Sequence, residues 1–386
     1  MISVRRNIKL FGYFQFFSHF LPTSPILIIY VSLVLKSYTL ALSLLTIQLI
    51  SSSILEIPTG ILSDKIGRKQ TCVLGGIFGV LEYIAFTIGG IYESYFIFSL
   101  GALFGGICLS FFSGNNHALL FESLKELKKK NHYHTVLGKT SSMLQLALGI
   151  SAILGGAVAE KSFLMVFVIS TIARFITLII TLFFVEPKKI QKSQNTSFSH
   201  FIKAVKTLIQ NKKLVNISIG DTINYTTGYI SHMLQPVFFQ SLISLSFIGI
   251  LRGLKHATGF FSFWFAGKII NKFGNIKTLI FGTTFNKINN LVSLIMNNTI
   301  SPILMSCGNL FFGTTQIAKE NIYQHSFSDQ ERATTGSVVS FLKNLSYGIC
   351  TLLTGILADI VGVRTTLIII TSIAFTGIYF FHKAKD

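Results

Sequence analysis

Long apolar stretches recur along the whole chain, separated by short polar breaks. Each stretch has about 20 residues or more, which is enough for a helix to cross a hydrocarbon core of about 30 Å. A backbone in lipid must satisfy its own hydrogen bonds, and a helix does so within one segment. The pattern therefore predicts twelve transmembrane helices, at 10–34, 40–63, 71–91, 94–121, 135–158, 162–185, 214–241, 246–270, 276–297, 300–320, 333–357 and 362–382.

One long polar connection, 186–213, is rich in Lys, Ser, Asn and Gln and separates the sixth stretch from the seventh. The flanking halves, 1–185 and 214–386, also resemble each other. The segment Gly60–Arg68 ends the second stretch, and a similar segment, Gly267–Asn275, ends the eighth. We therefore expect an all-α membrane protein with twelve transmembrane helices in two pseudo-symmetric six-helix halves. Parallel repeats of this kind are typical of transporters, whose substrate site lies between the halves near the membrane midplane.

Composition and charge agree with this prediction. Half of the 386 residues are hydrophobic and only 12% are charged, whereas a soluble domain has about 25%. With the N-terminus inside, 25 of the 33 Lys and Arg residues fall in the predicted inner segments, and only Lys36, Lys161 and Arg364 fall in outer loops. This bias places both termini in the cytoplasm, and we expect a multi-pass protein of a bacterial inner membrane. The net charge of +19 thus marks topology and not a nucleic-acid surface.

Several functional classes lack their motifs. The four cysteines lie in apolar stretches without C-x-x-C spacing, so neither a disulfide framework nor a zinc site is expected. The segment Tyr133–Thr140 resembles a phosphate-binding loop but has Tyr133 in place of the first glycine. No H-E-x-x-H or G-x-S-x-G motif is present. We therefore expect no enzyme, no ATP-driven pump, no metal and no cofactor.

The turn after the second stretch carries the most specific pattern. Glycine at position 60 lets another helix approach closely, and glycine at position 67 permits the positive φ of a tight turn. The carboxylate can pair at the N-terminus of a neighbouring helix, and the cations favour the cytoplasmic face. The alternative is an ordinary polar turn with topological charge. The residues of this turn are Gly60, Asp64, Lys65, Gly67, Arg68 and Lys69.

This ordered pattern resembles the G-x-L-[AS]-D-[RK]-x-G-R-[RK] signature of the major facilitator superfamily, and the twelve stretches extend the resemblance over essentially the whole chain. The Glu56–Gly60 and Ser113–Leu124 segments look like those of a drug-efflux-like bacterial branch, although His117 stands where Glu is usual and Glu122 where Asp is usual. The resemblance implies a secondary transporter that works by alternating access. It also implies a latch in which Asp64 holds the cytoplasmic ends of the halves together, against the start of the eleventh stretch. There, Ser328–Glu331 reads as a capping box.

Direction of transport is a separate question. The branch resemblance favours proton-coupled export of a drug-like or metabolite substrate. The glycine pattern of exporters is only partly kept in the fifth stretch, where Gly138, Gly155 and Gly156 match but Ala152 replaces proline. The alternatives are a proton-coupled importer of a neutral or anionic metabolite and a non-transporting receptor or scaffold. The partners expected are a small-molecule substrate, protons and the lipid bilayer, with no nucleic acid, and the chain is expected to be a monomer.

Carboxylates within the stretches are candidates for proton coupling, because a charge at membrane depth is costly and usually functional. Glu82 lies near the middle of the third stretch, Asp221 about two turns into the seventh, and Glu56 toward the inner end of the second. Burial disfavours the charged form of a carboxyl group, so each could bind and release a proton. The alternative is a carboxylate paired with a cation to hold helices together.

Polar side chains recur every three or four residues in the seventh stretch, which predicts one polar helix face turned toward a cavity or another helix. Other stretches add further polar groups. Few carboxylates occur among them, so a neutral, zwitterionic or anionic substrate is as well supported as a cationic drug. Arg252 lies near the outer end and can also extend to the interface. The cavity candidates are Gln15, His19, Asn115, His117, Asn224, His232, Arg252, Lys255, Gln316, Lys343, Asn344 and Tyr347.

Overall fold

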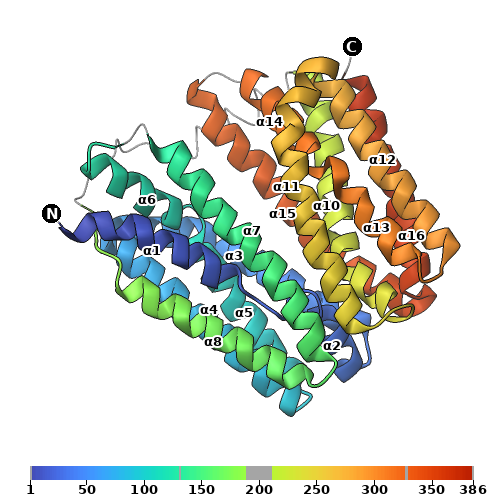
Figure 1. Ribbon diagram of the computed structural model, residues 1–386, viewed down its shortest axis with the longest axis horizontal. Helices are drawn as coiled ribbons and strands as arrows, with labels where there is room; N and C mark the ends of the chain where they lie inside the picture. The colour runs from blue at the N-terminus through green and yellow to red at the C-terminus, as the bar shows by residue number, and fades with distance from the viewer. Residues whose placement is uncertain (1, 130–131, 188–210, 327–328, 385–386) are drawn as a thin grey trace. The chain divides into compact units, whose positions relative to one another are not determined.

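The computed structural model describes residues 2–129, 132–187, 211–326 and 329–384, and the regular elements of this part are all helical (Figure 1). The first eight helices are α1 (Ile2–His19), α2 (Leu27–Leu35), α3 (Tyr38–Ile66), α4 (Arg68–Ile91), α5 (Tyr95–Phe112), α6 (Asn115–Glu126), α7 (Tyr133–Ala159) and α8 (Phe163–Leu182). The others are α10 (Lys212–Gln240), α11 (Leu245–Phe273), α12 (Asn275–Met296), α13 (Ser301–Cys307), the 3₁₀ helix η2 (Gly308–Phe311), α14 (Phe312–Ser326), α15 (Asp329–Val361) and α16 (Val363–Lys383).

The chain forms two compact units. Unit 1 comprises Met1–Ser193 and Leu245–Gly253, and unit 2 comprises Gln194–Ser244 and Leu254–Asp386. Most of the connection predicted at 186–213 lies outside the described residues, so the domain limits given by the sequence stay a prediction. Ser328 of the predicted capping box also lies outside them, although α15 begins at the next residue, Asp329.

The described helices group into twelve span-sized segments at the predicted positions, which confirms the fold class. Seven of these segments are long and apolar enough, by length and composition alone, to cross a membrane. They are the segments of α3, α4, α5 with α6, α7, α8, α15 and α16. The others are interrupted or carry polar faces. α10 is an example, because it contains the buried Asp221 and a row of Asn, Ser and Thr residues that lower its hydropathy.

Two of the predicted stretches divide into separate helices at Pro and Gly. In the first stretch, Pro22 and Pro25 lie between α1 and α2. The helix stops completely there, since each proline lacks an N–H and disfavours helical geometry in the residue before it. In the fourth stretch, the break between α5 and α6 falls at Gly114, whose φ is +67°. Glycine adopts this conformation without steric cost.

The break in the tenth stretch was not predicted. There α13 ends at Cys307 and the chain continues through η2 into α14. Neighbouring α12 supplies the missing hydrogen bonds, because the Asn286 side-chain amide donates to the carbonyl of Gly308 at 3.0 Å and that of Asn289 donates to the carbonyl of Leu304. Irregular backbone at membrane depth is tolerated where protein groups satisfy it in this way.

Each unit has its own apolar core. In unit 1, α1 packs along α6 and α7 (Figure 1), and its Phe11 and Phe14 are almost fully buried against Phe112 and Leu120. In unit 2, α16 packs against both α10 and α12, and Phe381 is buried in the contact. These cores fix the helices that carry the charged side chains described below.

Candidate functional site

Asp221 on α10 is the centre of a buried charged cluster in unit 2. Its side chain receives the Lys319 ammonium of α14 at 3.0 Å on Oδ1 and the Lys343 ammonium of α15 on Oδ2. The Tyr323 hydroxyl, also from α14, donates to Oδ2 at 3.4 Å. Asp221 is 3% exposed. One carboxylate thus joins three helices through two cations, and we call Asp221, Lys319 and Lys343 the Asp221 cluster.

Aromatic side chains lie beside this cluster. The Lys343 ammonium is 5.6 Å from the ring centroid of Tyr225, which is close enough for a cation–π interaction. The Tyr225 hydroxyl donates to Asn344 Oδ1 at 3.3 Å. The Tyr225, Tyr229 and Tyr347 rings contact one another, with Tyr225 and Tyr229 centroids 4.4 Å apart. Charged and aromatic groups are therefore contiguous in unit 2.

The sequence identified part of this cluster. Asp221 and Lys343 belong to the cluster, and the cavity candidates Asn344 and Tyr347 lie beside it. Lys319, however, was counted among the cytoplasmic positive charges. A topological role alone does not account for Lys319, which is 7% exposed and paired with Asp221. The signal that could have found it is the spacing of Gln316, Lys319 and Tyr323 at three and four residues, which places them on one face of α14.

A second polar group in unit 2 lies elsewhere on α10. The Lys255 ammonium of α11 donates to Gln235 Oε1 at 3.1 Å and lies 3.4 Å from His232 Nδ1. His232 follows Asp221 by 11 residues, a separation of about 16 Å along a helix. Two predicted cavity residues, His232 and Lys255, are thus together, at a different level from the Asp221 cluster.

The other second-half candidates have varied surroundings. The Asn224 side-chain amide donates to the carbonyl of Gly220 at 2.9 Å and lies against Gly377 of α16. Gln316 is half-buried on α14. Arg252 is 5% exposed and belongs to the α11 segment that groups with unit 1. Within the described residues, neither Asn224 nor Gln316 forms a hydrogen bond or ion pair with the Asp221 cluster.

In unit 1, Glu82 of α4 forms a buried ion pair with Arg174 of α8. Glu82 Oε2 is 3.3 Å from the guanidinium, and Gln48 donates to Oε1 at 3.0 Å. Arg174 also donates to the carbonyl of Ser18 at 3.1 Å and lies 5.4 Å from the ring centroid of Tyr83. Both oxygens of the carboxylate and much of the guanidinium are thus occupied. This geometry matches the alternative interpretation of Glu82, a carboxylate paired to hold helices together.

The first-half cavity candidates divide into buried and peripheral groups. Gln15 is 3% exposed, and within the described structure its Oε1 has no hydrogen-bond partner. His19 Nδ1 lies 3.0 Å from the backbone carbonyl of Gln15. His117 lies beside Phe11, with ring centroids 6.1 Å apart. Glu56, a proton-coupling candidate, is exposed and accepts a hydrogen bond from Ser113 at 3.2 Å.

The turn after α3 is organised around Arg68. Its buried guanidinium bonds Asp64 at 2.9 Å, Glu122 of α6 at 3.3 Å and the Ser63 hydroxyl at 2.6 Å. Asn115 of α6 accepts from the Ser63 hydroxyl at 2.6 Å and donates to the Arg68 carbonyl at 3.0 Å. Arg68 is therefore a structural link between α3, α4 and α6 as well as a positive charge. Asn115, predicted for the cavity, is part of this network.

Glycine has the predicted role at one position of the turn. Gly67 has a φ of +101°, and Gly274 at the corresponding place in unit 2 has a φ of +79°. At Gly60, by contrast, a Cβ atom would meet no described atom within 4 Å. Lys65 is exposed like Asp64. The close helix approach expected at Gly60 stays a prediction.

Glu186 completes the turn, and the sequence reasoning missed it. Its carboxylate accepts the backbone N–H groups of Arg68 and Lys69, each at 2.7 Å. These are the first amides of α4, where unsatisfied donors and the helix dipole favour an anion. Glu186 follows α8 by only a few residues, so the end of the six-helix half is tied back to the signature turn.

Removing this cap should loosen the start of α4. We expect Glu186→Ala to accelerate hydrogen–deuterium exchange at the first turn of α4, because Arg68 and Lys69 lose their acceptor. Peptide-resolved mass spectrometry of the purified protein measures this change. Glu320→Ala, which removes an exposed carboxylate on α14, is the matched control. Unchanged exchange at α4 in Glu186→Ala would contradict the capping role.

Lys287 on α12 is a buried cation of a different kind. It is 6% exposed, and among the described residues no ion pair or hydrogen bond is recorded for it. An unpaired buried polar group is costly, so we expect Lys287→Met to stabilise the folded protein by about 1–3 kcal/mol. Thermal unfolding in detergent measures the effect, and Lys272→Met at an exposed position is the control. A lower melting temperature for Lys287→Met would show that the ammonium makes a stabilising contact.

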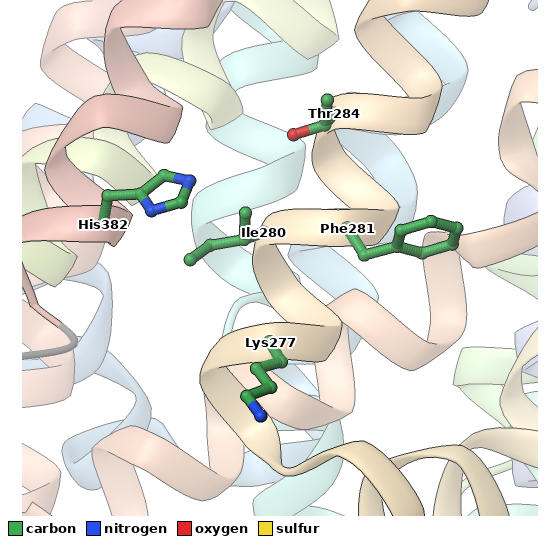
Figure 2. Close-up of a pocket in the computed structure, with 5 residues that line it drawn as sticks. All are labelled: Lys277, Ile280, Phe281, Thr284 and His382. Atoms are coloured by element: carbon green, nitrogen blue, oxygen red, sulfur yellow. The ribbon is translucent and has the colours of Figure 1, made fainter.

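An open pocket occurs between α12 and the end of α16 (Figure 2). Lys277, Ile280, Phe281 and Thr284 of α12 and His382 of α16 line it. The His382 ring faces Ile280, while Phe281 projects to the other side of α12 and Lys277 points away (Figure 2). The lining is mainly apolar and its polar groups do not converge on one point. We therefore assign no functional site to this pocket.

Comparison with known protein families shows which family the chain belongs to. The family model described as Major Facilitator Superfamily matches residues 10–349. The chain belongs to the Major Facilitator Superfamily. Comparison with curated protein sequences found no match. Membership in this superfamily confirms a multi-pass membrane transporter and not an enzyme, in agreement with the signature at Gly60–Lys69.

Solved structures of this superfamily share the fold at low identity. The nucleoside transporter NupG aligns with a TM-score of 0.82 at 12% identity, covering 99% of this chain and 99% of that chain. A bacterial homologue of the human lysosomal transporter Spinster gives 0.77 at 14%, covering 99% and 96%. A bacterial homologue of the iron transporter ferroportin gives 0.75 at 14%, covering 99% of each. Such identities establish the fold alone.

Proposed function

We propose that this superfamily member is a secondary transporter that couples movement of a small solute to protons, with Asp221 as the protonation site. The supporting observation is the buried Asp221 carboxylate bridging Lys319 and Lys343. Protonation of Asp221 removes both ion pairs at once, so the packing of α10, α14 and α15 depends on this single proton. A two-state element controlled in this way is what coupled transport requires.

Asp221 is a better candidate than the other two carboxylates. Glu82 has one cation partner, Arg174, so the charges of this pair are balanced. Arg174 also donates a hydrogen bond to the Ser18 carbonyl, which helps to fix its position. Glu56 is exposed and accepts a hydrogen bond from the Ser113 hydroxyl. Of the three carboxylates, only Asp221 is paired with two lysine side chains, and these lysines lie on two other helices.

The purified protein in sealed vesicles tests the coupling. Vesicles with a trapped pH-sensitive dye are given an imposed pH gradient, and candidate solutes (dyes, antibiotics and metabolites) are added in turn. We expect at least one solute to dissipate the gradient in vesicles with wild-type protein and not in protein-free vesicles. Solute flux that does not depend on the size and sign of the pH gradient would contradict proton coupling. Absence of flux for every solute would favour a receptor or scaffold.

The sequence elements shared with the drug-efflux-like branch support export across a bacterial inner membrane with both termini in the cytoplasm. Protease accessibility and cysteine labelling of terminal residues in right-side-out vesicles test the orientation. The drug-efflux resemblance is carried by the Glu56–Gly60 and Ser113–Leu124 segments, and not by the Asp221 cluster. The chemistry of the cluster therefore gives independent information about the substrate.

We propose the latch role for Asp64 on the same resemblance. Its carboxylate is 56% exposed and bonded to Arg68, so it keeps surface available for a second partner. We expect Asp64→Asn to reduce the transport rate about tenfold, equivalent to about 1.4 kcal/mol, without reducing membrane insertion. Flux assays and quantified membrane protein measure both. Unchanged flux in Asp64→Asn would exclude the latch.

A further inference from the structure

The Asp221 cluster carries more positive than negative charge. Lys319 and Lys343 share one carboxylate, and within the described residues no second acidic group is recorded against either lysine. Their side chains are only 9% and 13% exposed. Glu320, the next acidic residue on α14, is exposed. A buried excess of one positive charge is costly unless an anion neutralises it.

The surroundings do not supply that anion. From α14, Lys319 and Tyr323 face Asp221, and from α15, Lys343 does so. On α10 itself, Tyr225 lies under the Lys343 ammonium. α16 meets α10 at Gly220 through Phe381 and Gly377, which carry no charge. Every helix packed around Asp221 in the described structure thus contributes a cation, a neutral hydroxyl or an apolar group.

We infer that the solute is an organic acid whose carboxylate binds between Lys319 and Lys343, beside the Tyr225, Tyr229 and Tyr347 rings. This inference rests on the proposed transport function and names its substrate class. The two ammonium groups offer charge-assisted hydrogen bonds to a carboxylate, and the adjoining rings offer apolar contact to the rest of the solute. A bound carboxylate supplies the negative charge that the two lysines lack.

Direction of coupling follows from the same charges. A proton on Asp221 removes the competing carboxylate and leaves both lysines without a counter-ion, so the anion binds more tightly. By thermodynamic linkage, the bound anion equally favours the proton. Solute and proton then bind together and move in the same direction, so a carboxylate substrate favours the importer alternative, uptake driven by an inward proton gradient, over the export suggested by the drug-efflux-like branch. Export by exchange would instead require the two to compete.

A binding assay tests the substrate class independently of transport. Purified full-length protein is titrated with acetate, benzoate and succinate and with the matched neutral amides, and the melting temperature is recorded. We expect at least one carboxylate, and no amide, to raise the melting temperature of the wild type. Lys343→Gln keeps a balanced Asp221–Lys319 pair, so it should fold and should need at least about tenfold more carboxylate for half of the effect. Lys272→Gln, at an exposed position, is the control.

The proton linkage gives a second readout. Between about pH 6 and pH 8 acetate and benzoate stay ionised, so a stronger effect of either at pH 6 reports a protein group. We expect that pH dependence in wild type and its loss in Lys343→Gln. The proposal is overturned if no carboxylate in the series acts, if amides act equally, or if Lys343→Gln responds like wild type. Carboxylate binding without proton-coupled flux would contradict only the proposed transport function. Proton-coupled flux of neutral solutes alone would contradict only the proposal that the solute is an organic acid.

Discussion

Asp221→Asn is expected to abolish proton-driven flux and to destabilise unit 2 by about 3–5 kcal/mol, because it leaves two buried ammonium groups without a counter-ion. Asparagine has the shape of aspartate but cannot ionise, so the change removes charge and titration together. Flux in vesicles under an imposed pH gradient measures the first effect. Thermal unfolding of the purified protein measures the second.

A charge-balanced variant separates the two effects. In Asp221→Asn combined with Lys319→Met and Lys343→Met, all three charges are removed, so we expect most of the lost stability to return. Flux should not return, because the proton site and both cations are absent. If the triple variant transported solute in proportion to the pH gradient, the cluster would be a structural feature and the protonation site would lie elsewhere.

The fold was largely predictable because its signal is repeated along the chain. Lipid requires long apolar helices, and the positive charges add a second, independent record of topology. The breaks were harder to foresee. Pro22 and Pro25 marked one of them, but the break at Gly308 depends on Asn286 and Asn289, which lie on another helix. The sequence around Gly308 therefore does not indicate that these two hydrogen bonds form.

The candidate site was less predictable, since charges are balanced across helices that are distant in sequence. The sequence showed that Asp221 and Lys343 were unusual, because a charge at membrane depth stands out. It did not show that Lys319 joins them, since a lysine near the end of a stretch also fits a topological role. Glu186 was missed for a similar reason, because its contacts are also distant in sequence. Its two bonds go to backbone amides 118 and 117 positions away.

The ion pair in unit 1 is the rival proton site, and its partners predict a different response. We expect Arg174→Met alone to destabilise the protein by about 3–5 kcal/mol, because the Glu82 carboxylate stays buried without its cation. Combined with Glu82→Gln, the same change should recover most of the loss, since Gln48 can still bond a neutral amide at position 82. Thermal unfolding of the two variants and wild type measures this recovery.

Transport by the double variant then decides which carboxylate titrates. If the Glu82–Arg174 pair only holds α4 and α8 together, the neutral pair should keep gradient-driven flux within about threefold of wild type, which corresponds to less than about 1 kcal/mol in the barrier. Loss of flux in a stably folded double variant would instead make Glu82 the coupling residue. The two outcomes differ because the charges of the Glu82–Arg174 pair are balanced within unit 1, whereas Asp221 is paired with two cations and its cluster carries one excess positive charge.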